Sequence, residues 1–122
     1  MKSIAIIGAS ADRSKFGNKA VRAYVARGFR VFPVHPKETT IEGLPVYRSI
    51  AEVPERPNLV SLYLPPPVAL QVLPEIAKRG CDELWLNPGA DAPELVEAAE
   101  KLGLEVIQAC SIVAIGGSPH SM

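Results

Sequence analysis

The pattern of apolar and polar residues along the chain predicts alternating strands and helices. Short apolar runs of the kind buried on both faces of a parallel sheet occur at 3–7, 30–34, 58–64, 82–87 and 105–108. Apolar residues at helical spacing between these runs predict helices at 16–27, at 67–79 and after Asp91, followed by Gly28, Gly80 and Gly103. Because alternating strands and helices form parallel sheets with right-handed crossovers, we predict an α/β fold with a doubly wound five-stranded parallel sheet.

Several local signals refine these elements. The piece 45–47 reads as short and extended, and Ser49 to Glu52 reads as a capping box that opens a single helical turn. Asp91 and Glu94 form a second capping-box pattern at the start of the last predicted helix. Pro74 lies inside the 67–79 helix and predicts either a kink or a late start.

The first strand runs directly into a glycine turn and a helix. The apolar run 3–7 is followed by Gly8 and by small and polar residues up to Ser14. A helix that begins after such a turn presents free N–H groups and a partial positive charge, which suits a phosphate group. Gly17 falls on the helix face that packs on the sheet, where the absence of a side chain allows close approach to a strand.

Size, charge and cysteine content narrow the class of protein. The chain has 122 residues, so we expect a single domain over 1–122, with a tail that frays from about residue 116. A formal net charge of zero argues against a nucleic-acid binder, and no apolar run is long enough for a membrane span. Cys81 and Cys110 lack a metal or redox spacing, so reduced thiols in a cytoplasmic protein are expected.

The first group of candidate ligand-binding residues follows the first strand. These are Gly8, Ala9, Ser10, Arg13, Ser14 and Lys15. The second and third glycines of a dinucleotide fingerprint are replaced here by Ser10 and Arg13, which can both donate hydrogen bonds to phosphate. The alternative is that Arg13 and Lys15 are solvated loop charges.

The end of the second strand carries a basic residue in place of an acidic one. The segment is His35-Pro36-Lys37, whereas proteins that bind NAD usually place Asp or Glu there to hold the ribose hydroxyls. Lys37 favours a phosphorylated ribose, as in coenzyme A or NADP, unless it is simply a surface lysine. His35 either stacks on an adenine or fills the turn.

The remaining candidates lie at the ends of the third and fourth strands: Leu64, Pro65, Pro66, Asn87 and Gly89. The prolines end a strand and offer a rigid apolar rim for an adenine or a pantetheine arm. Asn87 either contacts pantetheine amides or caps the turn. Cys110 is either a reactive thiol or a buried structural residue, and no set of residues suggests a catalytic site.

Taken together, these segments resemble the small coenzyme A-binding proteins with a Rossmann-like fold and the related domain of the succinyl-CoA synthetase α subunit. The likeness extends from residue 2 to about 110 and rests on these segments: 6–10, 28–37, 41–47, 64–67 and 84–86. It implies coenzyme A phosphates at the Gly8–Ser14 loop, facing Ser10 and Arg13, with Lys37 after the second strand and Pro65-Pro66 at the rim. The family commonly has Asn-Pro where this chain has His35-Pro36, and a Gln-x-Gly turn where it has Asn87-Pro88-Gly89.

The sequence therefore predicts a protein that binds coenzyme A or an acyl-CoA as a non-catalytic binding or regulatory module. The alternative is a small NADP-linked oxidoreductase or nucleotide sensor. A homodimer or a partner enzyme that carries the chemistry is compatible with either reading. The resemblance does not imply ligase activity, because the phosphohistidine loop of the synthetase subunit has no counterpart here.

Overall fold

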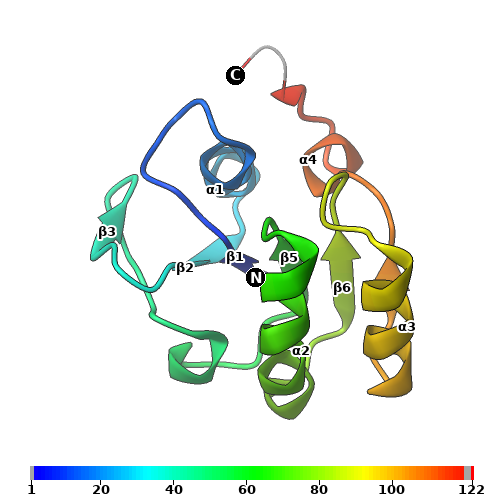
Figure 1. Cartoon of the computed structure of the whole chain (residues 1–122). Helices are drawn as coiled ribbons and strands as arrows, with labels where there is room; N and C mark the ends of the chain where they lie inside the picture. The colour runs from blue at the N-terminus through cyan, green and yellow to red at the C-terminus, as the bar shows by residue number, and fades with distance from the viewer. Residues whose placement is uncertain (1, 120–121) are drawn as a thin grey trace.

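Five parallel strands form the central sheet in the computed structural model, which describes residues 2–119 and 122 (Figure 1). The order across the sheet is β2-β1-β5-β6-β7. The strands are β1 (Ser3–Ile7), β2 (Arg30–Val34), β5 (Leu59–Leu62), β6 (Glu83–Leu86) and β7 (Val106–Ile107). From β1 the chain first adds β2 on one side of the sheet and then adds β5, β6 and β7 on the other side. The switch point of the fold therefore lies between β1 and β5, at the carboxyl ends of these two strands.

Helices cover both faces of the sheet, which confirms the doubly wound α/β prediction. The helices are α1 (Phe16–Ala26), α2 (Pro66–Arg79), α3 (Pro93–Lys101) and the short α4 (Ser111–Ala114). Successive residues of β1 divide between two cores: Ala5 and Ile7 pack with α2 and α3, while Ile4 and Ile6 pack with α1 and α4. All five residues of β1 are buried, as expected for a strand enclosed on both faces.

The chain between β2 and β5 contains a hairpin that differs from the predicted extended piece at 45–47. Strands β3 (Thr40–Ile41) and β4 (Leu44–Pro45) pair antiparallel, and Tyr47 then forms a parallel bridge with Val34. Glu42 and Gly43 both have positive φ, of 50° and 77°, as the turn between two short antiparallel strands requires. Tyr47 therefore adds a single pairing beyond β2, on the edge of the main sheet.

Neither predicted capping box forms. Ala92, not Asp91, is the N-cap of α3, and Pro93 occupies its first turn. Proline suits that position because it has no N–H and its φ is already helical. The single turn at Ile50–Glu52 is present as a 3₁₀ helix, but the Ser49 side chain does not cap it.

Helix α2 begins at Pro66 and continues through Pro74 to Arg79, so Pro74 does not delay its start. The predicted strands at 58–64, 82–87 and 105–108 are shorter in the structure, at β5, β6 and β7. Trp85 of β6 pairs with Ser61 and Ile107, is half-buried, and donates from Nε1 to Glu83 Oε1 at 3.2 Å.

Hydrogen bonds hold the tail beyond α4 as far as residue 119. The Gly117 N–H donates to the Ile112 carbonyl at 2.9 Å, and Lys19 Nζ donates to the Pro119 carbonyl at 2.8 Å. Residues 120 and 121, part of the tail that the sequence predicts to fray, lie outside the described residues. No helix within the described ranges is long and apolar enough to cross a membrane.

Candidate ligand-binding site

Two glycines bring the loop after β1 against the rest of the fold. Gly8 has a φ of 91°, and a Cβ there would lie 2.6 Å from the Tyr63 carbonyl oxygen. A Cβ on Gly17 would lie 2.2 Å from the Gly8 carbonyl oxygen. Both distances are shorter than real Cβ contacts, so glycine at both positions sets how closely α1 approaches β1 and β5. This confirms the close approach that the sequence predicts at Gly17.

Hydrogen bonds within the loop fix its shape. Ser10 Oγ accepts from the Asp12 N–H at 3.0 Å. Asp12 Oδ1 accepts from the Ser14 N–H at 2.9 Å and from the Ser14 hydroxyl at 2.7 Å. These bonds from Ser14 lower the pKa of the Asp12 carboxyl below its usual value. The hydroxyls predicted to face phosphate thus also serve the loop itself.

The helix after this loop has an open N-terminus. Lys15 is the N-cap of α1, no side chain caps the helix, and its first turn contains no acidic residue. By helix geometry the first N–H groups point out of this end, where their partial positive charge favours an anion. Lys15 adds a full charge at the same place.

Arg13, which the sequence predicts to face phosphate, forms an ion pair with the β3–β4 hairpin. Its side chain is 66% exposed and pairs with Glu42, with Arg13 Nε 3.6 Å from Glu42 Oε2. Glu42 also accepts from Asn18 Nδ2 at 3.1 Å, which ties the β3–β4 hairpin to the start of α1. Lys15, not Arg13, lines the cavities described next.

A first cavity of about 460 Å³ opens between the carboxyl ends of β1, β2 and β5. Among the predicted residues its wall includes Gly8, Ala9, Ser10, Lys15, His35, Pro36 and Leu64. Lys37 is exposed and is not part of the wall, whereas Arg48 and Ser49, which the sequence analysis missed, are. Arg48 follows the Tyr47 bridge to Val34, so this pairing brings it to the end of β2. Glu75 of α2 lines the cavity on another side.

His35 has a structural role that fixes the form of its ring. Its Nδ1 accepts from the N–H groups of Lys37 and Glu38, both at 3.0 Å. An accepting Nδ1 carries no hydrogen, so the neutral ring has its proton on Nε2. In an asparagine, Oδ1 is bonded to Cγ just as Nδ1 is in histidine, so an Asn at this position could accept the same two hydrogen bonds. This is a physical reason why His35-Pro36 can stand where the sequence comparison expects Asn-Pro.

A second cavity of about 570 Å³ adjoins the first. Gly8, Lys15, Tyr63 and Leu64 line both cavities. The second also includes the predicted residues Ser14, Pro65, Pro66 and Gly89. It therefore crosses from the β1–α1 loop, over the end of β5, to the turn after β6.

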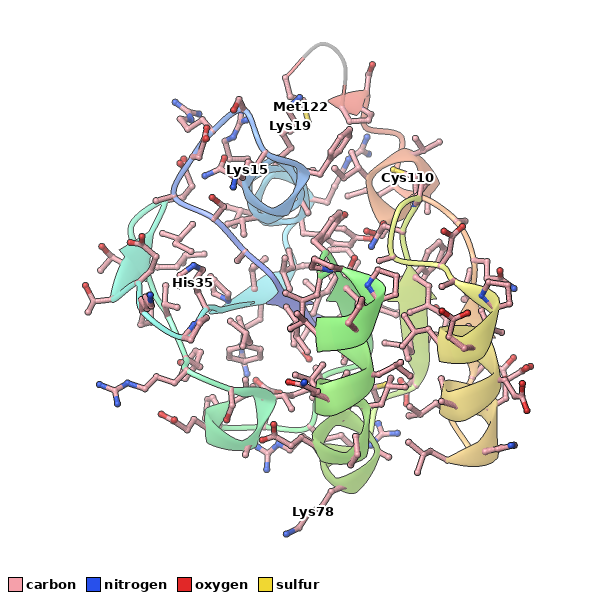
Figure 2. All side chains as sticks on the ribbon, viewed as in Figure 1. Lys15, Lys19, His35, Lys78, Cys110 and Met122 are labelled. Atoms are coloured by element: carbon pink, nitrogen blue, oxygen red, sulfur yellow. The ribbon has the colours of Figure 1, made fainter. Side chains whose placement is uncertain are left out.

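A third cavity of about 470 Å³ continues in the same direction toward α4. It shares Phe16, Tyr63 and Pro88 with the second cavity and reaches Cys110. In Figure 2, Lys15 and His35, which line the first cavity, lie on the left side of the view, and Cys110, which lines the third, lies on the right. We call these three neighbouring cavities, which share lining residues, the trough.

Asn87 lines the third cavity, but its amide group is used inside the protein. Asn87 Nδ2 donates to Ser61 Oγ at 2.8 Å and to the Leu62 carbonyl at 2.9 Å, and Oδ1 accepts from the Ser111 N–H at 2.9 Å. Ser111 Oγ lies 2.8 Å from Ser61 Oγ and 3.0 Å from the Tyr63 hydroxyl. This buried network joins β5, β6 and α4 beneath the trough. Burial raises the pKa of Tyr63, so its hydroxyl remains protonated at neutral pH.

The trough combines positive charge with apolar walls. It offers an open helix end with Lys15, a second cation at Arg48, and apolar walls of Leu64, Val68 and Val72. No three His, Cys, Asp or Glu side chains group as a metal site would need in the part of the chain that the structure describes. Cys110 is a free, half-buried thiol in the wall of the third cavity.

Several known proteins are similar to this chain in sequence and in fold. The model of the family described as CoA binding domain matches residues 2–116. The α subunit of the ADP-forming acetate–CoA ligase II of Pyrococcus furiosus is 29% identical over 119 residues, which cover 87% of this chain and 26% of that subunit. The chain spans only about an eighth to a quarter of the curated relatives it matches first.

Two solved structures have the same arrangement. A conserved hypothetical protein from Pyrococcus furiosus has 37% sequence identity and a TM-score of 0.85, over 93% of this chain and 99% of its own. The dinucleotide-forming acetyl-coenzyme A synthetase 1 of Ca. Korarchaeum cryptofilum, in its apo form, has 25% identity and a TM-score of 0.77, over 88% of this chain and 26% of its own. The family gives no support to the NADP alternative, and the chain belongs to the CoA-binding domain family.

Proposed function

We propose that this protein binds coenzyme A along the trough. The adenosine lies in the first cavity, the pyrophosphate at the α1 N-terminus beside Lys15, and the pantetheine arm in the second cavity. The observation that carries the proposal is that Lys15 and the open end of α1 lie where the first two cavities meet. Diphosphate in the middle of a long ligand requires positive charge at that point.

Arg48 is the group we assign to the 3′-phosphate of the ribose. It lines the first cavity at the end of β2, while Lys37, the candidate from the sequence, stands outside the wall. A charge-assisted hydrogen bond to phosphate is worth about 1.5–3 kcal/mol, or roughly ten-fold or more in affinity. Lys37 then adds only a screened surface charge.

Calorimetric titration with coenzyme A and dephospho-coenzyme A tests this assignment. Wild-type protein should bind coenzyme A at least ten-fold more tightly than dephospho-coenzyme A, because only the former has the 3′-phosphate. Arg48→Gln should abolish this preference, and the matched variant Lys37→Gln should keep most of it. Absence of binding to either ligand would refute the proposed function, and loss of the preference in Lys37→Gln alone would move the phosphate to Lys37.

We further propose that the protein is a cytoplasmic binding module without catalysis of its own, acting alone, as a homodimer or with a partner enzyme. Support comes from the trough, whose lining includes no acid, base and nucleophile joined by hydrogen bonds among the described residues. The matching ligase is named as an α subunit, which fits a partner for this chain as well. Chromatography of acetyl-CoA incubated with the protein should show the thioester intact, and release of coenzyme A would contradict the non-catalytic role.

A further inference from the structure

The third cavity is more apolar than the site of a coenzyme A thiol alone requires. Its wall includes Phe16, Tyr63, Pro88, Val113 and Pro119. None of the described residues that line it is an Asp, Glu, Lys, Arg or His. Its volume of about 470 Å³ lies within the range of small-molecule sites.

Two polar side chains that line this cavity, Asn87 and Tyr63, already have partners within the protein. The Asn87 amide bonds to Ser61, Leu62 and Ser111, and the Tyr63 hydroxyl bonds to Ser111 Oγ. A ligand group entering here therefore finds mainly carbon surface. That environment selects a hydrocarbon group over a polar or charged one, because a polar group would lose its hydrogen bonds to water.

Two apolar side chains at the cavity are exposed to solvent. Phe16 is 46% exposed and Val113 is 58% exposed, and they lie on different helices, α1 and α4. Exposed apolar side chains in the wall of a cavity are typical of a binding surface.

The position of the cavity identifies its occupant. It shares Phe16, Tyr63 and Pro88 with the second cavity, where the pantetheine arm is proposed to lie. The group attached beyond the pantetheine sulfur is the acyl chain of a thioester. We propose that the third cavity binds the aliphatic acyl chain of an acyl-CoA, so that the protein prefers acyl-CoA to free coenzyme A. This inference rests on the proposed function.

Residues 117–119 line the cavity, and we expect them to limit the length of the acyl chain. Pro119 lines the cavity, and its carbonyl accepts from Lys19 Nζ at 2.8 Å. A Cβ on Gly117 would lie 2.7 Å from Ile112 Cγ2, so the segment packs closely on α4. A cavity with a wall at this point accommodates a short aliphatic chain better than a long one.

Calorimetric titration with coenzyme A, acetyl-CoA, butyryl-CoA and palmitoyl-CoA tests the proposal. Burial of each methylene group should tighten binding by up to about four-fold, so butyryl-CoA should bind at least ten-fold more tightly than coenzyme A. Palmitoyl-CoA should bind less tightly than butyryl-CoA, because its chain exceeds the cavity. Equal affinities for coenzyme A and butyryl-CoA would overturn the proposal while leaving coenzyme A binding intact. Binding of none of the four ligands would instead refute the proposed function.

A pair of valine variants locates the effect. Val113→Asp places a charge in the third cavity and should remove the preference for butyryl-CoA over coenzyme A. Val25→Asp is the matched control, since Val25 is a similarly exposed helical valine, 48% exposed, that lines none of the three cavities. A preference unchanged in Val113→Asp would overturn the proposal.

Alkylation of the cysteines gives a readout that needs no variant. Butyryl-CoA should slow the reaction of Cys110 with iodoacetamide several-fold more than coenzyme A does at equal saturation. Cys81 serves as the internal reference, because burial raises its pKa to about 11 and keeps the thiol protonated and slow to react. Equal protection by the two ligands would contradict an acyl chain beside Cys110.

Discussion

Single residues fix the geometry around the trough. At Gly17 the absence of a side chain is essential, because a Cβ added there would lie 2.2 Å from the Gly8 carbonyl oxygen. Asn87 illustrates the opposite case, a side chain whose three hydrogen bonds join two strands and a helix. Each residue can be tested by a single substitution to alanine.

Gly17→Ala should destabilise the protein, although alanine normally favours a helix over glycine by about 1 kcal/mol. The added methyl group would press on backbone, so α1 or the loop must shift, at a cost of about 1–3 kcal/mol for overpacking. Urea unfolding followed by circular dichroism measures the difference. A gain in stability would show that α1 can move away from β1 freely.

Asn87→Ala should lower the free energy of unfolding by about 3 kcal/mol. It leaves the Ser111 N–H and the Leu62 carbonyl without a partner inside the protein, and each unsatisfied buried group costs about 1–3 kcal/mol. Gln71→Ala, at an exposed position on α2, is the control and should change stability little. Similar unfolding midpoints for both variants would show that the hydrogen bonds of Asn87 do not stabilise the fold.

Some of these single-residue roles could be predicted from the sequence, and others could not. Gly17 could be predicted because its constraint follows from one helix packed on one strand. Lys15 could be listed among the loop cations, but not separated from Arg13. That choice depends on Glu42, which the hairpin brings to Arg13 from a distant part of the chain.

The strands and helices determine where charged and polar groups lie around the trough. The apolar runs locate all five strands, because burial on both faces leaves a strong signal in the sequence. Capping residues are predicted less well: Pro93 begins α3 after Ala92 in place of an Asp91 cap, and the Ser49 side chain makes no capping hydrogen bond. Helix α1 is the element whose N-terminus carries the proposed phosphate site.

Lys15→Gln should weaken coenzyme A binding about ten-fold, because it removes a charge beside the proposed pyrophosphate. Arg13→Gln is the matched control from the same loop and should change affinity less than two-fold, since Arg13 pairs with Glu42 outside the cavities. Titration calorimetry at one fixed salt concentration compares the two. A larger loss in Arg13→Gln would place the phosphates where the sequence alone puts them.

The hydrogen bond between Tyr24 of α1 and Ser111 of α4 should make the stability of the protein fall in alkaline solution. Burial raises the pKa of Tyr24 to about 12, and its hydroxyl donates to the Ser111 carbonyl at 2.8 Å. The folded protein thus holds a proton that the unfolded chain releases near pH 10, so stability should fall as pH rises from about 10 to 12. Tyr24→Phe should be less stable at pH 7 yet lose less over that interval, as urea unfolding at several pH values would show. An equally steep fall in both proteins would rule out Tyr24 as a cause.

At the scale of the whole molecule, the trough is assembled from segments that are far apart in the sequence. The carboxyl ends of β1, β2, β5 and β6 could be predicted to meet, because parallel strands place these ends at one edge. The positions of Arg48 and Pro119 could not be predicted, because each depends on a long-range contact. Arg48 depends on the Tyr47–Val34 bridge. Pro119 depends on the hydrogen bond from Lys19 to its carbonyl.

Coenzyme A should stabilise the folded protein as a whole, since a site built from so many segments exists only in the native state. At a free ligand concentration a hundred times the Kd, the gain is about 2.7 kcal/mol, or roughly 10 °C in melting temperature for a domain of this size. Differential scanning calorimetry measures the shift. Dephospho-coenzyme A at the same concentration should give a smaller shift, and identical shifts would contradict a specific site for the 3′-phosphate.

The place of Trp85 gives the molecule a built-in optical probe. It is the single tryptophan of the chain, half-buried on β6 between its neighbours in β5 and β7, and it lines none of the three cavities. Its fluorescence emission should therefore shift to longer wavelength when the sheet comes apart and stay nearly constant when the trough fills. A single intrinsic signal can thus separate unfolding from occupancy without any label.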